Sequence, residues 1–373
     1  MKVDHTGILR ETADGTNGSR WARGPEEPTP FERILNSLRL PYVLSAFVFA
    51  NLLAAPGFLV VEFVRTGSWD AAARIVLANG GVVTWEWVAN AALFVLVNFL
   101  VFLGIRGMRM WLLSAKDELV GLCPDGEPAY RHAFLFTSAM WPVLISVGLE
   151  LISGVGLVFS ESGSREGLFL IPLEILRFLL TLGILNFVWI YATGLLGLYA
   201  LGKQPLRLKS YRQDSLLGTR LIGQLSLRFA FSYFTVLLIV LIGNSFAGDL
   251  STALTVGVFA AIGLPMFFLP LMSIRRKMAE VKGREVSAVR SRFAQAVADL
   301  REGDPPSQNG PLALVDRRLR ELTSLQVLEM EMHETANIRT WPYDSRMLGQ
   351  LTIIVLSVTA AMITRLLINA FRL

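Results

Sequence analysis

Three ionisable residues, Glu150, Glu174 and Arg177, lie in the middle of two long apolar segments of the chain. A charged side chain deep in hydrocarbon costs at least ~2.5–3.5 kcal/mol on an insertion scale, so such residues generally face a partner or water. Glu150 and Arg177 lie at matching distances from the ends of consecutive segments, and Glu174 is one helical turn from Arg177. We therefore predict an intramembrane polar cluster of these three residues. It is either a static ion-pair clasp that fixes helix packing or a polar site for transport or gating.

No residue pattern indicates catalysis or a resident cofactor. The sequence contains no GxSxG or HExxH motif, and its histidines, His5, His132 and His333, lie far apart. One cysteine, Cys123, excludes an internal disulfide. Residues 197–204 come close to the spacing of a phosphate-binding loop, but they lack its final Ser or Thr and end an apolar segment. We expect no enzyme activity, no metal site and no cofactor.

The composition assigns these residues to a membrane protein. Of the 373 residues, 53% are hydrophobic and only 17% are charged, whereas roughly a quarter are charged in a typical soluble domain. These charges are too few to coat a soluble surface of this size, which excludes a soluble enzyme, a disordered scaffold and a disulfide-rich secreted module. The predicted fold class is all-α, a polytopic integral membrane protein.

Seven segments reach the ~20 apolar residues that a membrane span needs. In lipid, backbone N–H and C=O groups must pair within the segment, so each is expected to be a helix. The fourth is long enough to hide a re-entrant loop, an alternative that stays open. The segments are Pro41–Val64, Trp85–Ile105, Phe134–Phe159, Leu168–Leu201, Ser226–Phe246, Thr252–Met272 and Met347–Phe371.

The basic residues predict the orientation of these spans. Alternate intervals between the segments hold 28 and 4 Lys and Arg residues. Because cytoplasmic loops carry the excess of basic residues, the N-terminus is expected in the cytoplasm and the C-terminus outside. The expected location is the inner or plasma membrane.

Five regions follow from this layout. Residues 1–30 are expected to be a disordered cytosolic tail, 31–40 an interfacial amphipathic helix, 41–272 a six-span membrane domain, 273–346 a cytoplasmic helical hairpin and 347–373 the seventh span. Thr29 and Glu32 have the spacing of a capping box at the start of the amphipathic helix. The apolar face of that helix is expected to lie on the inner leaflet.

The hairpin is predicted from two arms of nearly equal length, Ile274–Glu302 and Leu312–Arg339, separated by a Gly- and Pro-rich breaker. Spacing at helical positions predicts a contact face between the arms, formed by Val286, Val289, Phe293, Leu300, Val315, Leu319 and Leu322. At its base lies a basic collar expected to attract anionic lipid, formed by Arg275, Arg276, Lys277, Lys282 and Arg284. Nucleic acid is not expected as a partner, because the positive-inside bias already accounts for these charges.

Two classes of function fit this layout. The first is a non-catalytic interaction, assembly or signalling component, whose hairpin binds a cytosolic protein or a second copy of the chain. The alternative is a channel or transporter with a polar intramembrane site between spans three and four. We favour the first, because few polar residues are available to line a pore.

Overall fold

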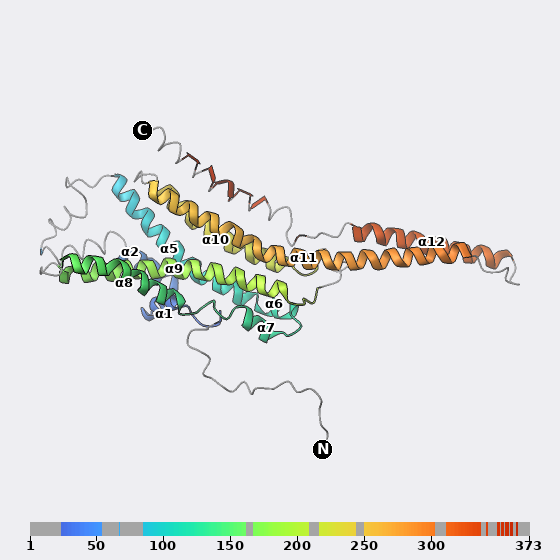
Figure 1. Cartoon of the computed structure of the whole chain (residues 1–373), viewed down its shortest axis with the longest axis horizontal. Helices are drawn as coiled ribbons and strands as arrows, with labels where there is room; N and C mark the ends of the chain where they lie inside the picture. Colours follow the sequence, from blue (N-terminus) through green and yellow to red (C-terminus); the bar gives the residue numbers. More distant parts are fainter. Residues whose placement is uncertain are drawn as a thin grey trace, which may run out of the picture.

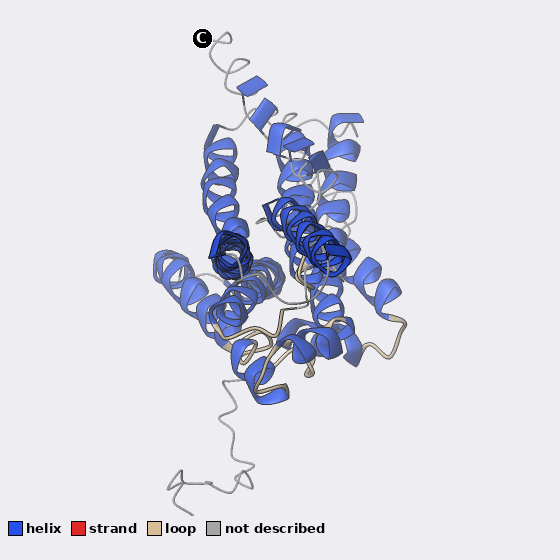
Figure 2. Ribbon diagram, turned by 90° about the vertical axis from the view of Figure 1, so that its right-hand side faces the viewer, coloured by secondary structure: helices blue, strands red, loops and turns tan. Residues whose placement is uncertain are grey.

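The computed structural model describes residues 24–53, 67, 85–161, 167–208, 216–243, 250–302, 311–336 and 341, with short stretches between 349 and 364. Every secondary-structure element in these ranges is an α-helix, as Figure 2 shows. The helices are α1 (Pro30–Ser37), α2 (Tyr42–Leu52), α5 (Trp85–Ser114), α6 (Lys116–Leu122), α7 (Glu127–Ala133), α8 (Trp141–Glu161), α9 (Gly167–Lys203), α10 (Arg220–Gly243), α11 (Leu250–Glu302) and α12 (Pro311–Ala336).

Four of these helices contain stretches long and apolar enough to cross a membrane. They are Ala92–Ser114 in α5, Phe178–Lys203 in α9, Arg220–Leu241 in α10 and Gly257–Ala298 in α11. Shorter apolar helices are Tyr42–Leu52 and Trp141–Leu151. The chain is therefore an all-helical integral membrane protein with several candidate spans. Most of the predicted seventh span, and the end of the first, lie outside the described residues.

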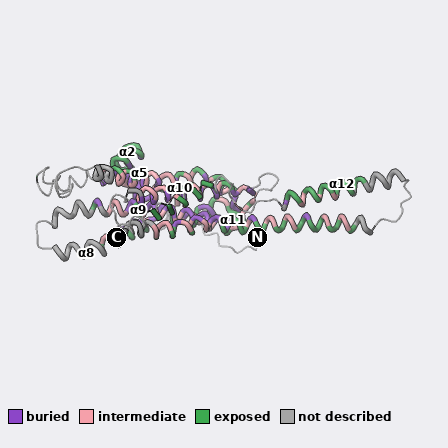
Figure 3. The backbone as a smooth tube through the Cα atoms, turned by 90° about the horizontal axis from the view of Figure 1, so that it is seen from above, coloured by how far each residue is buried: buried purple, intermediate pink, exposed green. Residues whose placement is uncertain are grey.

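The membrane bundle is built around α9, which packs against α5, α8, α10 and α11. Figure 3 shows buried residues concentrated where these helices run side by side. On the outside of the bundle, large apolar side chains such as Phe231 on α10 and Val258 on α11 are 57% and 58% exposed. Soluble proteins rarely leave large apolar surfaces in water, so these outward faces are suited to contact with lipid.

Helix α9 settles the alternative that the sequence leaves open for its fourth apolar segment. It is one uninterrupted helix of 37 residues, which at 1.5 Å per residue is about 55 Å long. A re-entrant loop needs a turn within the segment, and α9 has none.

Two helices begin away from their predicted positions. Helix α8 begins at Trp141 and not at Phe134, and Pro142 is its second residue. Proline is tolerated in the first turn of a helix but not in its interior, so a start at Phe134 was wrong. Helix α10 begins at Arg220, six residues before the predicted Ser226.

Helix α11 continues for 53 residues, through both Pro265 and Pro270. Each proline removes a backbone hydrogen bond from the helix. Tyr191 on α9 donates its hydroxyl to the carbonyl of Gly263 at 2.8 Å, and Tyr233 on α10 donates to the carbonyl of Phe259 at 3.0 Å. Pro265 leaves the carbonyl of Ala261 without its helical donor, and these side chains add hydrogen bonds to α11 two residues to either side of that carbonyl.

The two tyrosines also bring α9, α10 and α11 into close contact. Their rings stack with centroids 4.2 Å apart and an angle of 10° between planes. A Cβ added to Gly263 would lie 2.4 Å from the Tyr233 ring. Glycine at this position therefore permits the close approach of α10 to α11.

Beyond the bundle, α12 packs along the C-terminal part of α11, and the two helices project away from the other elements (Figures 1 and 3). Arg292 on α11 and Glu331 on α12 form an ion pair at 3.9 Å. Val289 on α11 and Thr335 on α12 are fully buried. Among the described side chains of the projecting pair, few are fully buried.

We predict that Gly263→Ala lowers the free energy of unfolding by about 1–3 kcal/mol, because the added methyl group overpacks the contact with Tyr233. Gly283→Ala is the matched control on the same helix, since a Cβ there meets nothing within 4 Å. The control is expected to be neutral or to stabilise the helix by up to ~1 kcal/mol. Denaturation of both variants in detergent measures the difference. Equal stability of the two variants would contradict the close contact.

Candidate functional sites

The predicted intramembrane cluster is described in part. Glu150 on α8 is half-buried, and its carboxylate accepts a hydrogen bond of 3.3 Å from the Thr181 hydroxyl on α9. Thr181 lies one turn beyond Arg177 and two turns beyond Glu174, on the same side of α9. Glu150 therefore reaches the side of α9 that carries the other two residues. The side chains of Glu174 and Arg177 lie outside the described ones, so the three-residue cluster stays a prediction.

The basic collar lies where α11 leaves the bundle. Gly202, near the end of α9, packs against Ser273 of α11, which places the collar level with the end of α9. Arg275 and Arg276 are exposed. The Arg275 guanidinium lies 4.4 Å from the centre of the Trp341 ring, so the chain that follows α12 returns to the level of the collar. Binding of anionic lipid here stays a prediction.

Acidic groups occupy part of the collar. Lys277 and Arg284 both form ion pairs with Glu280, the first at 3.8 Å. Lys282 is half-buried. The Arg284 side chain is 76% exposed, so Arg275, Arg276 and Arg284 together provide the exposed positive charge of the set.

On α11 the described members of the predicted contact face are covered, and their contact with α12 stays a prediction. Val289 is fully buried, while Val286 and Phe293 are half-buried. Leu300 and Val315 lie outside the described side chains.

On α12 the predicted face is wrong. Leu319 and Leu322 are 57% and 55% exposed. A second series at helical spacing faces α11 in their place, formed by Leu325, Leu328, Met332 and Thr335, all half-buried or buried. The two series overlap in sequence. They differ only in which side of α12 they occupy, and the rotation of α12 against α11 decides which side is covered.

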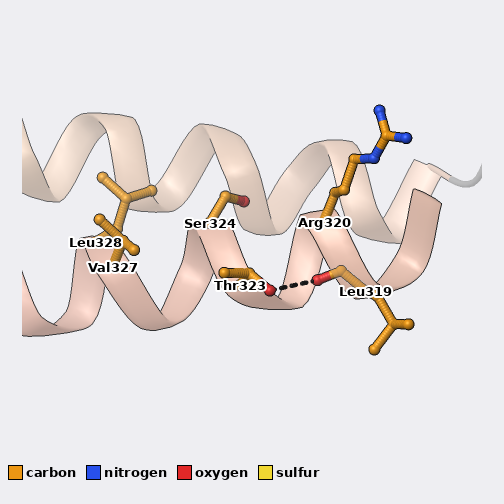
Figure 4. A pocket seen from close by; sticks show the side chains of 6 residues that line it. All are labelled: Leu319, Arg320, Thr323, Ser324, Val327 and Leu328. Carbon is orange, nitrogen blue, oxygen red and sulfur yellow. Dashed lines mark hydrogen bonds between the residues drawn. The ribbon is translucent and has the colours of Figure 1, made fainter. Parts of the chain in front are cut away.

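The exposed side of α12 carries a shallow groove of about 560 Å³. Figure 4 shows the residues that line it, Leu319, Arg320, Thr323, Ser324, Val327 and Leu328. Val327 and Met330 on this side are 57% and 64% exposed. The outward side of α12 therefore exposes apolar side chains over about three helical turns, with polar residues such as Arg320 and Gln326 between them.

A buried ion pair that the sequence does not reveal joins α1 to α5. The capping box is confirmed, since the N–H of Glu32 donates to the Thr29 hydroxyl and the N–H of Thr29 donates to the Glu32 carboxylate. The same carboxylate lies 2.8 Å from Arg109 Nε, and the two side chains are 1% and 11% exposed. Arg109 also donates to the carbonyl of Pro25 at 3.1 Å.

A second set of contacts fixes the same segment to α6 and α7. Lys116 Nζ lies 2.5 Å from a Glu26 carboxylate oxygen and 2.9 Å from one of Glu127. The hydrogen bond to Glu26 raises the pKa of Lys116, and the hydrogen bond from Lys116 lowers the pKa of Glu127. Ser138 donates to the carbonyl of Glu27 at 2.7 Å. We call Glu26, Glu32, Arg109, Lys116 and Glu127 the N-terminal clamp.

The clamp changes two expectations for the start of the chain. Residues 24–29, which the sequence places in a disordered tail, are fixed to the bundle. Phe31 and Leu35, expected on the inner leaflet, are fully buried against protein. A buried carboxylate needs a cation, and the one sequence signal for this contact was the presence of Arg109. In the sequence, however, Arg109 stands out only as one of the basic residues between two apolar segments.

Among the described residues, no group of three His, Cys, Asp or Glu side chains is placed to hold a metal ion. Cys123 is buried, and burial raises the pKa of its thiol. No family model, curated protein or solved structure matches the chain. The function is therefore argued from the geometry of this chain alone.

We predict that Arg109→Met lowers the free energy of unfolding by about 3–5 kcal/mol, because it leaves the Glu32 carboxylate buried without its cation. Adding Glu32→Gln is expected to recover part of this loss, since glutamine keeps the cap and removes the charge. Arg33→Met is the control, because its pair with Glu27 is largely exposed and such pairs contribute ~0–1 kcal/mol. Denaturation in detergent compares the three variants. If Arg109→Met were no more harmful than Arg33→Met, the clamp would not be a determinant of stability.

Proposed function

We propose that this chain is a non-catalytic interaction, assembly or signalling component of the membrane, and that the α11–α12 pair is its docking module. The observation that carries this proposal is the outward side of α12. Leu319, Leu322 and Met330 stay 55–64% exposed there, on helices that project beyond the bundle (Figure 1). An apolar face kept in contact with solvent is typical of a surface that binds another chain.

The proposal includes a topology. The positive-inside bias supports seven spans, a cytoplasmic N-terminus and a C-terminus outside, in the inner or plasma membrane. The α11–α12 pair is then a cytoplasmic hairpin between spans six and seven. The contact of Arg275 with Trp341 supports this layout, because it brings the two ends of the hairpin to the same level.

We further propose that the basic collar binds anionic lipid headgroups at the inner leaflet. Basic residues near a membrane surface attract such lipids by about 1 kcal/mol each. Tryptophan is suited to the headgroup level, and Trp341 lies against the Arg275 guanidinium. Lipid binding at the collar would fix the angle at which the α11–α12 pair leaves the membrane.

A second candidate function is a channel or transporter with a polar site between α8 and α9. The observation that favours it is the hydrogen bond from Thr181 to the half-buried Glu150 carboxylate. Ion flux in proteoliposomes that is lost in Glu150→Gln would favour this function over the first.

The docking role predicts that the double variant Leu319→Glu, Met330→Glu loses its binding partner. Two carboxylates on the apolar side of α12 would have to be desolvated on binding, which we expect to lower partner recovery by about tenfold or more. The measurement is recovery of other chains, including differently tagged copies of this one, with the protein purified from native membranes.

Ala294→Glu, Ala298→Glu is the matched control, because it adds the same charges at exposed positions of α11. It is expected to keep the partner. Equal recovery with both double variants would contradict a docking role for the outward side of α12.

A further inference from the structure

Four residues on the outward side of α12 have the spacing of a coiled-coil seam. Leu319, Thr323, Gln326 and Met330 alternate by four and three positions, which is the spacing of d and a positions in a heptad. All four are exposed, and none is charged. We call them the α12 seam.

The polar members of the seam are compatible with burial in a helix pair. The Thr323 hydroxyl already donates to the carbonyl of Leu319 at 2.7 Å (Figure 4). It therefore needs no water when the seam is covered. Gln326 meets its own counterpart in a parallel in-register pair, where each side-chain amide can both donate and accept a hydrogen bond.

We infer that the occupant of the α12 seam is the same helix of a second copy in the same membrane, packed parallel and in register. This inference rests on the proposed docking role. Chains that leave one membrane face run in the same direction, so a two-fold axis along the helices brings each seam residue against its own counterpart.

The size of the seam selects a second copy over a soluble partner. A stable specific interface buries about 800 Å² on each partner, and three turns of one helix provide less. A copy confined to the same bilayer is present at a much higher effective concentration, which compensates for a small contact. A soluble protein lacks this advantage.

The residues beside the seam match in this arrangement. In a parallel pair, each g position faces the following e position of the partner helix. This brings Leu322 against Val327 of the second copy, so both flanking apolar side chains are covered. The groove that Val327 lines lies where Leu322 of the second copy arrives, once on each side of the two-fold axis.

One flanking pair opposes this contact. The same rule brings Glu329 against Glu334 of the second copy, and like charges at these positions weaken a coiled coil. The pair lies at the end of α12 nearer the membrane. Replacing Glu329 by lysine should therefore strengthen the dimer, an effect that a general loss of structure could not produce.

The test is disulfide cross-linking of the full chain in phospholipid vesicles at a high ratio of lipid to protein. Gln326→Cys should form a cross-linked dimer about tenfold more than Gln295→Cys, because only the first lies in the seam. Gln295 is an exposed glutamine on α11, so the substitution is matched. The wild type gives the background, since its one cysteine, Cys123, is buried.

Two further changes in the Gln326→Cys background test the arrangement. Leu322→Glu should lower cross-linking by about tenfold, because it buries an unpaired carboxylate against Val327. Glu329→Lys should raise it by about threefold through attraction to Glu334.

Equal cross-linking of Gln326→Cys and Gln295→Cys, or no effect of Leu322→Glu, would overturn the inference. The inference could be overturned in this way while the Leu319→Glu, Met330→Glu variant still loses a different chain that purifies with the wild type. The docking role would then stand, and only the identity of the partner would be wrong.

Discussion

The continuity of helix α11 from the bundle into the projecting pair is the constraint on which the rest of the structure depends. A membrane span must pair its backbone groups internally because lipid offers them no partners, and α11 continues this pairing beyond the bundle for a total of 53 residues. The α11–α12 pair is therefore connected to the bundle by a helix, not by a loop. The hydroxyls of Tyr191 and Tyr233 support the stretch around Pro265.

The end of the bundle that carries α1, α6 and α7 is held by a different kind of interaction. The pair of Glu32 and Arg109 is almost completely buried, and the desolvation of two such charges offsets much of their attraction. Its main contribution is therefore specificity, because α1 has only one place where its carboxylate meets a cation. Residues 24–29, which precede α1, are held against α5 by Arg109 and against α6 by Lys116. The N-terminal clamp and the projecting pair lie on separate parts of the molecule (Figure 1).

Local rules predicted much of the fold from the sequence. The all-helical class, the long apolar helices and the capping box of Thr29 and Glu32 all depend on composition or on near neighbours in the chain. The start of α8 is a local error, since Pro142 belongs in the first turn of a helix. The other errors concern packing between distant segments. The partner of Glu32 is 77 residues away, and the side of α12 that meets α11 depends on the rotation of one helix against another. Two overlapping apolar series on α12 satisfy the same spacing, so no local signal decides between Leu319 and Leu325.

The most direct measurement is the distance between spin labels at Met272 and Gln295, both exposed on α11, with the protein in lipid vesicles. An unbroken helix predicts one narrow distribution of distances centred at about 35 Å, because a helix rises 1.5 Å per residue. A broad distribution, or one centred at a much shorter distance, would show that α11 is broken where it leaves the bundle. The projecting pair would then be a separate, loosely attached element, and the continuous helical connection between the bundle and the α11–α12 pair would not exist.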